Sequence, residues 1–129
     1  MGVTLYDFTM SVRAIRGAIQ VDENSVDSIG RGTQELLAAI LTANKLTVDQ
    51  VISVLLTATP DLTATFPAAA AREVGFEAVP LLCAVEIDVP GSLPRVIRAM
   101  FTVEIDSNPS EISHIYLGGA KVLRRDIAQ

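Results

Sequence analysis

Two long apolar runs joined by a short polar turn constrain the fold of this chain more than any other stretch. The first occupies residues 76–87 and the second residues 96–105. Apolar residues alternate with others at a period of two in the second run, which is typical of a β-strand. Between the runs, Pro90-Gly91 favours a tight turn, because Pro fixes φ and Gly tolerates a positive φ. We therefore expect two strands, with Pro80 indicating an edge position or a bulge in the first.

Each of these runs contains a charged residue of interest, Glu86 in the first and Arg98 in the second. A charge costs several kcal/mol to desolvate without a partner. Three arrangements satisfy both side chains. They pair with each other, they reach solvent at a strand end, or they hold a polar ligand.

The remaining patterns predict a mixed α/β (α+β) domain with one five-stranded sheet. A long helix, with Asn24 or Ser25 as N-cap, is expected to end near Asn44, and a short alanine-rich helical turn follows Pro67. The nearly all-apolar run 51–58 is typical of a central strand that is buried on both faces. We expect residues 1–10 to be a flexible extension and residues 11–129 to form a single domain. The expected strands cover residues 11–21, 51–58, 76–87, 96–105 and 114–117.

The composition points to an assembly of several copies. Half of the 129 residues are hydrophobic and only 19% are charged, and the mean hydropathy is +0.41. Strands with apolar residues on both faces need cover on both faces, and one long helix covers only part of one. We expect other copies of the chain to cover the rest.

Composition and charge also exclude several classes of function. A net charge of −5 without a basic run argues against a nucleic-acid partner. No apolar run approaches the roughly 20 residues of a membrane span, and the first ten residues do not have the form of a secretory signal. One Cys and one His offer few ligands for a metal site. We expect a cytoplasmic protein without a metal.

The candidate site residues are arginines that lie near strands. Arg16 lies between Ala14 and Ala18 on one face of its strand, which leaves room above it. Arg98 and Arg124 also lie in or near strands, whereas Arg72 lies on the short helical turn. Arginine suits bidentate recognition of carboxylates. The pattern is compatible with an anion pocket, although structural ion pairs and solvated surface charges explain it as well.

No pattern points to a nucleophile, a general base or a phosphate loop. His114 adjoins a short strand, and nothing in the sequence supports a Ser-His-Asp triad around it. Cys83 in an apolar strand is typical of an inert buried thiol. Gly30-Arg31-Gly32 lies inside a helical pattern and matches no nucleotide-binding fingerprint.

Seven segments of the chain form a recognisable set, in order and at fitting spacing. They are Arg13 to Ala18, Thr57 to Leu62, Phe66-Pro67-Ala68 leading to Ala71-Arg72-Glu73, Val79-Pro80 through Cys83 to Glu86, Gly91-Ser92-Leu93 leading to Ile97-Arg98, His114 to Leu117, and Val122-Leu123-Arg124. Through these segments the sequence resembles, from about Val12 to Asp126, the trimeric, α/β-barrel class of monofunctional chorismate mutases (the AroH type).

The resemblance implies an isomerase that rearranges chorismate to prephenate, in the biosynthesis of phenylalanine and tyrosine by the shikimate pathway. This intramolecular Claisen-type reaction needs no cofactor, metal or nucleophile. It also implies a homotrimer that forms a pseudo-α/β barrel, with the dianionic substrate bound between subunits.

The resemblance further implies roles for individual residues. Arg98 is expected to bond the ether oxygen and a carboxylate, and Arg16 to bind a carboxylate with support from Tyr116. Glu86 and Cys83 are expected near the ring hydroxyl, which favours Glu86 and Arg98 meeting opposite ends of a ligand over a mutual ion pair. Parity places Cys83 and Glu86 on opposite faces of a regular strand, so either a bulge intervenes or Cys83 acts through its backbone. The remaining wall of the site is expected from the neighbouring subunit, through Phe66, Arg72, Leu123 and Arg124.

Two departures from the family and two alternative functions remain. Where many members carry a lysine three residues after the phenylalanine, this chain has Ala69, which predicts weaker steering of the substrate. Leu82 replaces a common threonine and removes one polar contact beside Cys83.

The alternative functions are those of an enamine/imine deaminase of the RidA kind, whose glycine-rich segments are absent from the sequence, and of a non-catalytic trimeric carboxylate-binding protein.

Overall fold

A computed structural model describes residues 10–106 and 108–124 of the chain. It contains one five-stranded sheet with the strand order β3-β2-β4-β1-β5. All but the last residue of the expected N-terminal extension lies outside the described residues. The strands are β1 (Ser11–Gln20), β2 (Val51–Ala58), β3 (Leu81–Val85), β4 (Val96–Ile105) and β5 (Ile115–Leu117).

The sheet is mixed, as expected, and β4 lies at its centre. β4 pairs antiparallel with β1 over its whole length and antiparallel with β2 on its other side. The outer strands β3 and β5 pair parallel with β2 and β1, respectively. The two long central strands therefore place ten-residue rows of side chains side by side.

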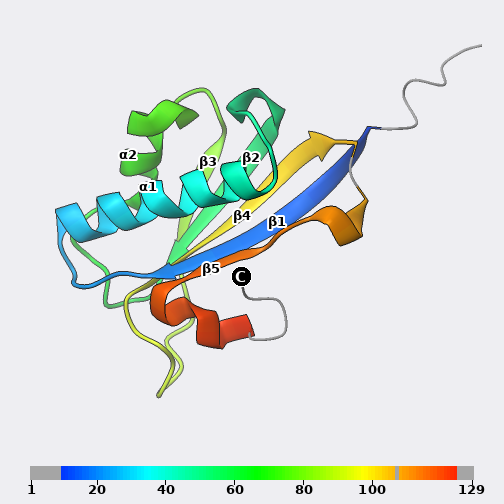
Figure 1. The fold of residues 1–129 in the computed structure, drawn as a ribbon. Coiled ribbons are helices and arrows are strands. Elements are labelled where there is room, and N and C mark those ends of the chain that lie inside the picture. The colour runs from blue at the N-terminus through cyan, green and yellow to red at the C-terminus, as the bar shows by residue number, and fades with distance from the viewer. Residues whose placement is uncertain (1–9, 107, 125–129) are drawn as a thin grey trace, which may run out of the picture.

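The two α-helices lie together on one side of the sheet (Figure 1). α1 (Val26–Ala43) begins at Ser25, whose side chain accepts a hydrogen bond from the Ser28 N–H, and ends at Asn44. α2 (Pro67–Ala71) has Pro at its first position, where a missing N–H costs nothing. The helical turn η3 (Arg72–Phe76) follows α2 and contains Gly75 with φ of 103°. The described part of the chain also contains three 3₁₀ turns, η2 (Val48–Gln50), η4 (Pro109–Glu111) and η5 (Gly118–Arg124).

The main core lies between these helices and one face of the sheet. Alternate residues of the central strands, including Ile15 and Phe101, pack there against Leu36 and Ile40 of α1. Phe76 meets Phe101 edge to face, with 5.9 Å between the ring centroids. A second, small cluster on the opposite face joins Ala18 and Val96 to Tyr116 and Ala120. η5 therefore covers one end of the face opposite to α1.

The third strand is shorter than predicted. The apolar residues Phe76 and Val79 are buried in the turn that follows α2 and not in the sheet, so that β3 begins only after Pro80. β3 is an edge strand, as Pro80 indicated, but its pairing with β2 is regular and has no bulge. The one irregularity in the ladders lies in β2, between Val51 and Ser53.

The prediction that β2 is buried on both faces is wrong for the isolated chain. Val54 and Leu56 face the helices and are buried, whereas Leu55 points to the opposite face and remains exposed. Within the described residues, no helix is long and apolar enough to cross a membrane.

Candidate active site

One row of side chains crosses all five strands on the face opposite to α1. Pairing across the ladders brings these residues into line and onto the same face of the sheet. The row contains Ala84, Thr57, Arg98, Ala18 and Tyr116, in the order of the strands from β3 to β5. Ala18 is covered by the second cluster, whereas Ala84 and Arg98 are exposed.

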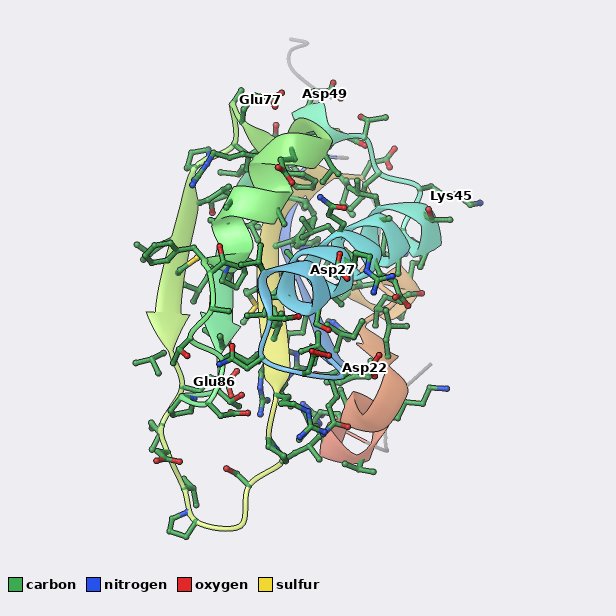
Figure 2. All side chains as sticks on the ribbon, turned by 90° about the vertical axis from the view of Figure 1, so that its left-hand side faces the viewer. Asp22, Asp27, Lys45, Asp49, Glu77 and Glu86 are labelled. Carbon is green, nitrogen blue, oxygen red and sulfur yellow. The ribbon has the colours of Figure 1, made fainter. Side chains whose placement is uncertain are left out.

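Glu86 forms an ion pair with Arg98, the middle residue of this row. The distance from Arg98 Nε to Glu86 Oε2 is 3.1 Å, and the Arg98 side chain is 45% exposed against 15% for Glu86. Glu86 lies where the chain leaves β3 for the loop that leads to β4 (Figure 2). Both residues line one hollow of about 540 Å³ together with Leu123. The mutual pair, which the family resemblance made the less favoured arrangement, is thus the one that forms.

Thr57 holds the same carboxylate from β2. Its hydroxyl donates a hydrogen bond of 2.7 Å to Glu86 Oε2, the oxygen that also accepts from Arg98. The next residue, Ala58, accepts a bond of 2.9 Å from the Glu86 N–H through its carbonyl. Glu86 is therefore fixed by its backbone and by its side chain.

A second hollow, of about 250 Å³, adjoins the first and shares Thr57 and Arg98 with it. Arg16 and Arg124 also line this hollow, as does the buried Tyr116. Three arginines thus lie around a small space in a protein whose net charge is −5. Such an arrangement favours a ligand with more than one negative charge.

His114 supports this site from the segment before β5. Its Nδ1 accepts a hydrogen bond of 3.0 Å from the backbone N–H of Arg16. Burial lowers the pKa of His114 from its ordinary value, and the positive charges of Arg16 and Arg124 lower it further. The neutral ring with an unprotonated Nδ1 is the form that can accept this bond.

Leu123 and Arg124 differ in placement from what the family resemblance implied. Both were expected from the neighbouring subunit. In the structure, η5 brings this chain's own Leu123 beside Arg98 and Glu86, and its own Arg124 beside Arg16. η5 packs against this face through Ala120, and the side chains that follow it are thereby brought to the same site.

Cys83, Phe66 and Arg72 are not brought to this site within one chain. Cys83 pairs with the buried Leu56 and packs against the main core, on the face opposite to Arg98. It lines a separate hollow of about 440 Å³ with Phe66, a residue that is 70% exposed. Arg72 is exposed in η3, on the helical side of the molecule.

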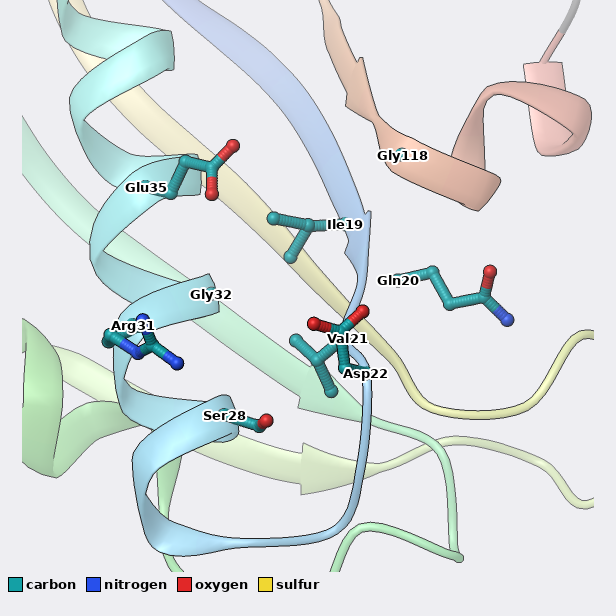
Figure 3. Close-up of a pocket in the computed structure, with 9 residues that line it drawn as sticks. All are labelled: Ile19, Gln20, Val21, Asp22, Ser28, Arg31, Gly32, Glu35 and Gly118. Atoms are coloured by element: carbon teal, nitrogen blue, oxygen red, sulfur yellow. The ribbon is translucent and has the colours of Figure 1, made fainter.

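A further hollow lies between α1 and the end of β1 (Figure 3). Asp22, Glu35 and Arg31 line it. Arg31 forms an ion pair of 2.8 Å with Asp27, four residues earlier in the helix. Since two carboxylates line this hollow and its one arginine is paired, it offers no surplus of positive charge for an anionic ligand.

Sequence reasoning missed two residues of the site, Thr57 and His114. Thr57 occurs in a matching segment, and its parity in β2 relative to Leu56 could have placed it on the same face as Arg98. Its contact with Glu86 depends on how the chain leaves β3, which no local pattern gives. His114 was considered only as a catalytic base, whereas in the structure it bonds the backbone of β1.

Comparisons with known proteins agree on one family. The model of the family "Chorismate mutase type I" matches residues 12–127. The chain is 46% identical over 117 residues to the chorismate mutase AroH of Thermus thermophilus. This match covers 90% of this chain and 96% of that protein. The chain is also 42% identical over 120 residues to the chorismate mutase AroH of Bacillus subtilis (strain 168). That match covers 92% of this chain and 94% of that protein.

A solved structure is similar as well. The fold matches that of a chorismate mutase from Clostridium thermocellum with a TM-score of 0.84 and 48% sequence identity. The match covers 85% of this chain and 98% of that one.

Proposed function

The chain belongs to the chorismate mutase type I family, and from this premise we propose that it converts chorismate to prephenate at the arginine-lined hollows of its sheet. The protein is then an isomerase in the biosynthesis of aromatic amino acids. The observation that carries the proposal is the placement of Arg98, with Glu86, Arg16 and Arg124, around one pair of adjoining hollows.

The reaction explains the chemistry of this site. Chorismate is a dianion, and its ether C–O bond breaks while a C–C bond forms within the same molecule. Negative charge grows on the ether oxygen as the bond breaks. A site of this kind accelerates the reaction by holding the compact reactive conformer and by placing fixed donors at that oxygen.

Arg98 is the residue proposed to stabilise the ether oxygen. Its ion pair with Glu86 engages Nε, and within the described ranges its terminal nitrogens bond no other residue. A guanidinium stays charged at any working pH and carries five N–H donors in a rigid plane. It can therefore keep its contact with Glu86 and still donate to a ligand.

The other residues are proposed to orient the dianion. Arg16, supported by Tyr116, binds one carboxylate, and Arg124 adds positive charge to the same hollow. Glu86 accepts a hydrogen bond from the ring hydroxyl. Leu123 supplies an apolar wall beside Arg98.

We further propose that the enzyme is a homotrimer and that a neighbouring copy completes each site. Cys83 and Phe66 line a hollow on the other face of the sheet, and Arg72 lies on the helical side. These residues can meet a ligand held by Arg98 only if they come from another copy.

A cytoplasmic location fits an enzyme of this pathway with one cysteine.

A turnover assay with purified protein tests the proposal. Chorismate absorbance should fall with time, and prephenate should appear in equal amount. No turnover by the intact protein at micromolar concentration contradicts it. The deaminase and the non-catalytic alternatives have no specific observation in their favour, and turnover of an enamine instead of chorismate would revive the first of them.

A further inference from the structure

Thr57 lies between the two hollows and touches the charged pair at their junction. It faces Arg98 across the β2–β4 ladder and lines both hollows. Its hydroxyl and Arg98 Nε donate to one and the same oxygen, Oε2 of Glu86, at 2.7 and 3.1 Å. No other described residue bonds this carboxylate.

The burial of Glu86 makes the hydrogen bond from the Thr57 hydroxyl important for the carboxylate. The Glu86 side chain is 15% exposed, so its negative charge has little access to water. A mostly desolvated carboxylate needs protein donors, and hydrogen bonds to a charged acceptor are roughly twice as strong as neutral ones. Without Thr57, Arg98 would be the only side chain among residues 10–106 and 108–124 left to satisfy the charge.

Loss of the Thr57 hydroxyl would also affect the position of Arg98. A carboxylate with a single donor attracts that donor more strongly and is free to change its rotamer. Either change would move the guanidinium, since the ion pair is its anchor. Catalysis by preorganised donors is sensitive to shifts of this kind.

We infer that Thr57 is a positioning residue that holds Glu86 and, through it, sets the orientation of Arg98 for the rearrangement. The inference rests on the proposed function. The competing explanation is that a β-branched residue simply fits a central strand, with its hydroxyl incidental.

The two explanations are separated by Thr57→Val and Thr57→Ser. Val keeps the shape and the β-branch but loses the donor, whereas Ser keeps the donor and loses the methyl group. We expect Thr57→Val to lower kcat by about tenfold or more, the effect typical of one hydrogen bond to a charged group, with a smaller change in KM. Thr57→Ser should stay within about threefold of the parent kcat, because the donor is retained.

Thr102→Val is the matched control. Thr102 lies on the same face of β4 as Arg98, four positions along the strand, and lines neither hollow. The loss of its hydroxyl should leave kcat unchanged. Thermal unfolding and the assembled mass are measured for every variant, so that a folding defect is not read as a catalytic one.

A double-mutant cycle with Glu86→Ala, which removes the acceptor altogether, tests whether Thr57 acts through Glu86. If it does, Thr57→Val should change kcat by less than about twofold once Glu86 has been replaced, because coupled residues are not additive. Full additivity would overturn the inference, as would equal losses in the Val and Ser variants.

Crystal structures of the Val and Ser variants give a readout that is independent of turnover. The Glu86 carboxylate should move in the Val variant only, and an unmoved carboxylate there would contradict the inference even if the parent protein did not turn over chorismate.

Discussion

At the scale of single residues, the charged side chains of the site are held in place by an ion pair and by hydrogen bonds. Arg98 is anchored by Glu86, Glu86 by Thr57, and the backbone of Arg16 by His114. Each of the three bonds joins residues on different strands or segments. The positions of the two arginines proposed to bind substrate therefore depend on the tertiary fold and not on local structure.

His114 predicts a pH dependence of stability. Burial lowers its pKa in the folded protein, so below the unfolded value of about 6.5 the unfolded chain takes up a proton more readily than the folded one. The stabilisation by neutral His114 is present above pH 6.5 and is lost as the pH falls below it. We expect Tm to decline as the pH falls below about 6.5, and to decline less in His114→Asn, which keeps an acceptor but does not titrate. Equal slopes in the two proteins over this range would contradict the role of His114.

At the scale of elements, the alternation of residues predicted most of the strand positions that form the site. The bounds of β4 agree with the prediction, and Arg16 shares one face of β1 with Ala14 and Ala18, as the alternation indicated. The long helix also begins and ends at the expected caps. These are local signals, carried by periodicity and by capping side chains.

Features that depend on contacts between distant segments were not predictable in this way. The ion pair of Glu86 with Arg98 depends on the path of residues 87–95 between the strands. The apolar residues Phe76 and Val79 carry no local signal that distinguishes a buried turn from a strand. Leu123 and Arg124 reach the site because η5 folds back onto the sheet, which the sequence of that turn does not reveal.

The glycines of α1 give a test of helix packing. A Cβ at Gly30 would meet only Ala70 Cβ, at 3.8 Å, whereas a Cβ at Gly32 would collide with Val21 Cγ1. Val21 is buried and has little room to move. Since Ala is favoured over Gly in a helix by about 1 kcal/mol, Gly30→Ala should raise the free energy of unfolding by up to that amount.

Gly32→Ala gains the same helix propensity but forces Val21 out of place, at a cost of about 1–3 kcal/mol. We therefore expect it to lower the stability. Chemical denaturation of the two variants beside the parent protein measures the difference. Equal stabilisation by both substitutions would show that the close approach of α1 to the end of β1 has been misjudged.

At the scale of the whole molecule, the uncovered sheet face is the feature that calls for other copies. Apolar residues on this face remain exposed in the single chain, and Leu82 is 67% exposed. One row across the strands consists of Leu82, Leu55, Met100 and Arg16. Its apolar part is continuous with the arginine-lined hollow, so a copy that covers it would also lie at the proposed site.

Mixed assemblies test whether the site is shared between chains. Arg98→Ala and Arg72→Ala are each expected to lose activity. If Arg98 and Arg72 come from different copies, co-expression of the two variants in equal amounts should restore about one quarter of the parent activity, because that share of interfaces pairs an intact Arg98 with an intact Arg72. Activity no higher than the mean of the separate variants would show that the two residues do not serve one site from different chains.

The proposed rearrangement depends on Arg98 as the donor to the ether oxygen. The decisive measurement is kcat/KM for chorismate in Arg98→Ala, with Arg31→Ala as the control that removes one positive charge from the exposed pair on α1. Loss of one preorganised donor typically costs roughly a hundredfold to a thousandfold, so we predict a loss of at least a hundredfold for Arg98→Ala and less than about twofold for Arg31→Ala. A folded Arg98→Ala variant that keeps more than a tenth of the parent kcat/KM would contradict the account.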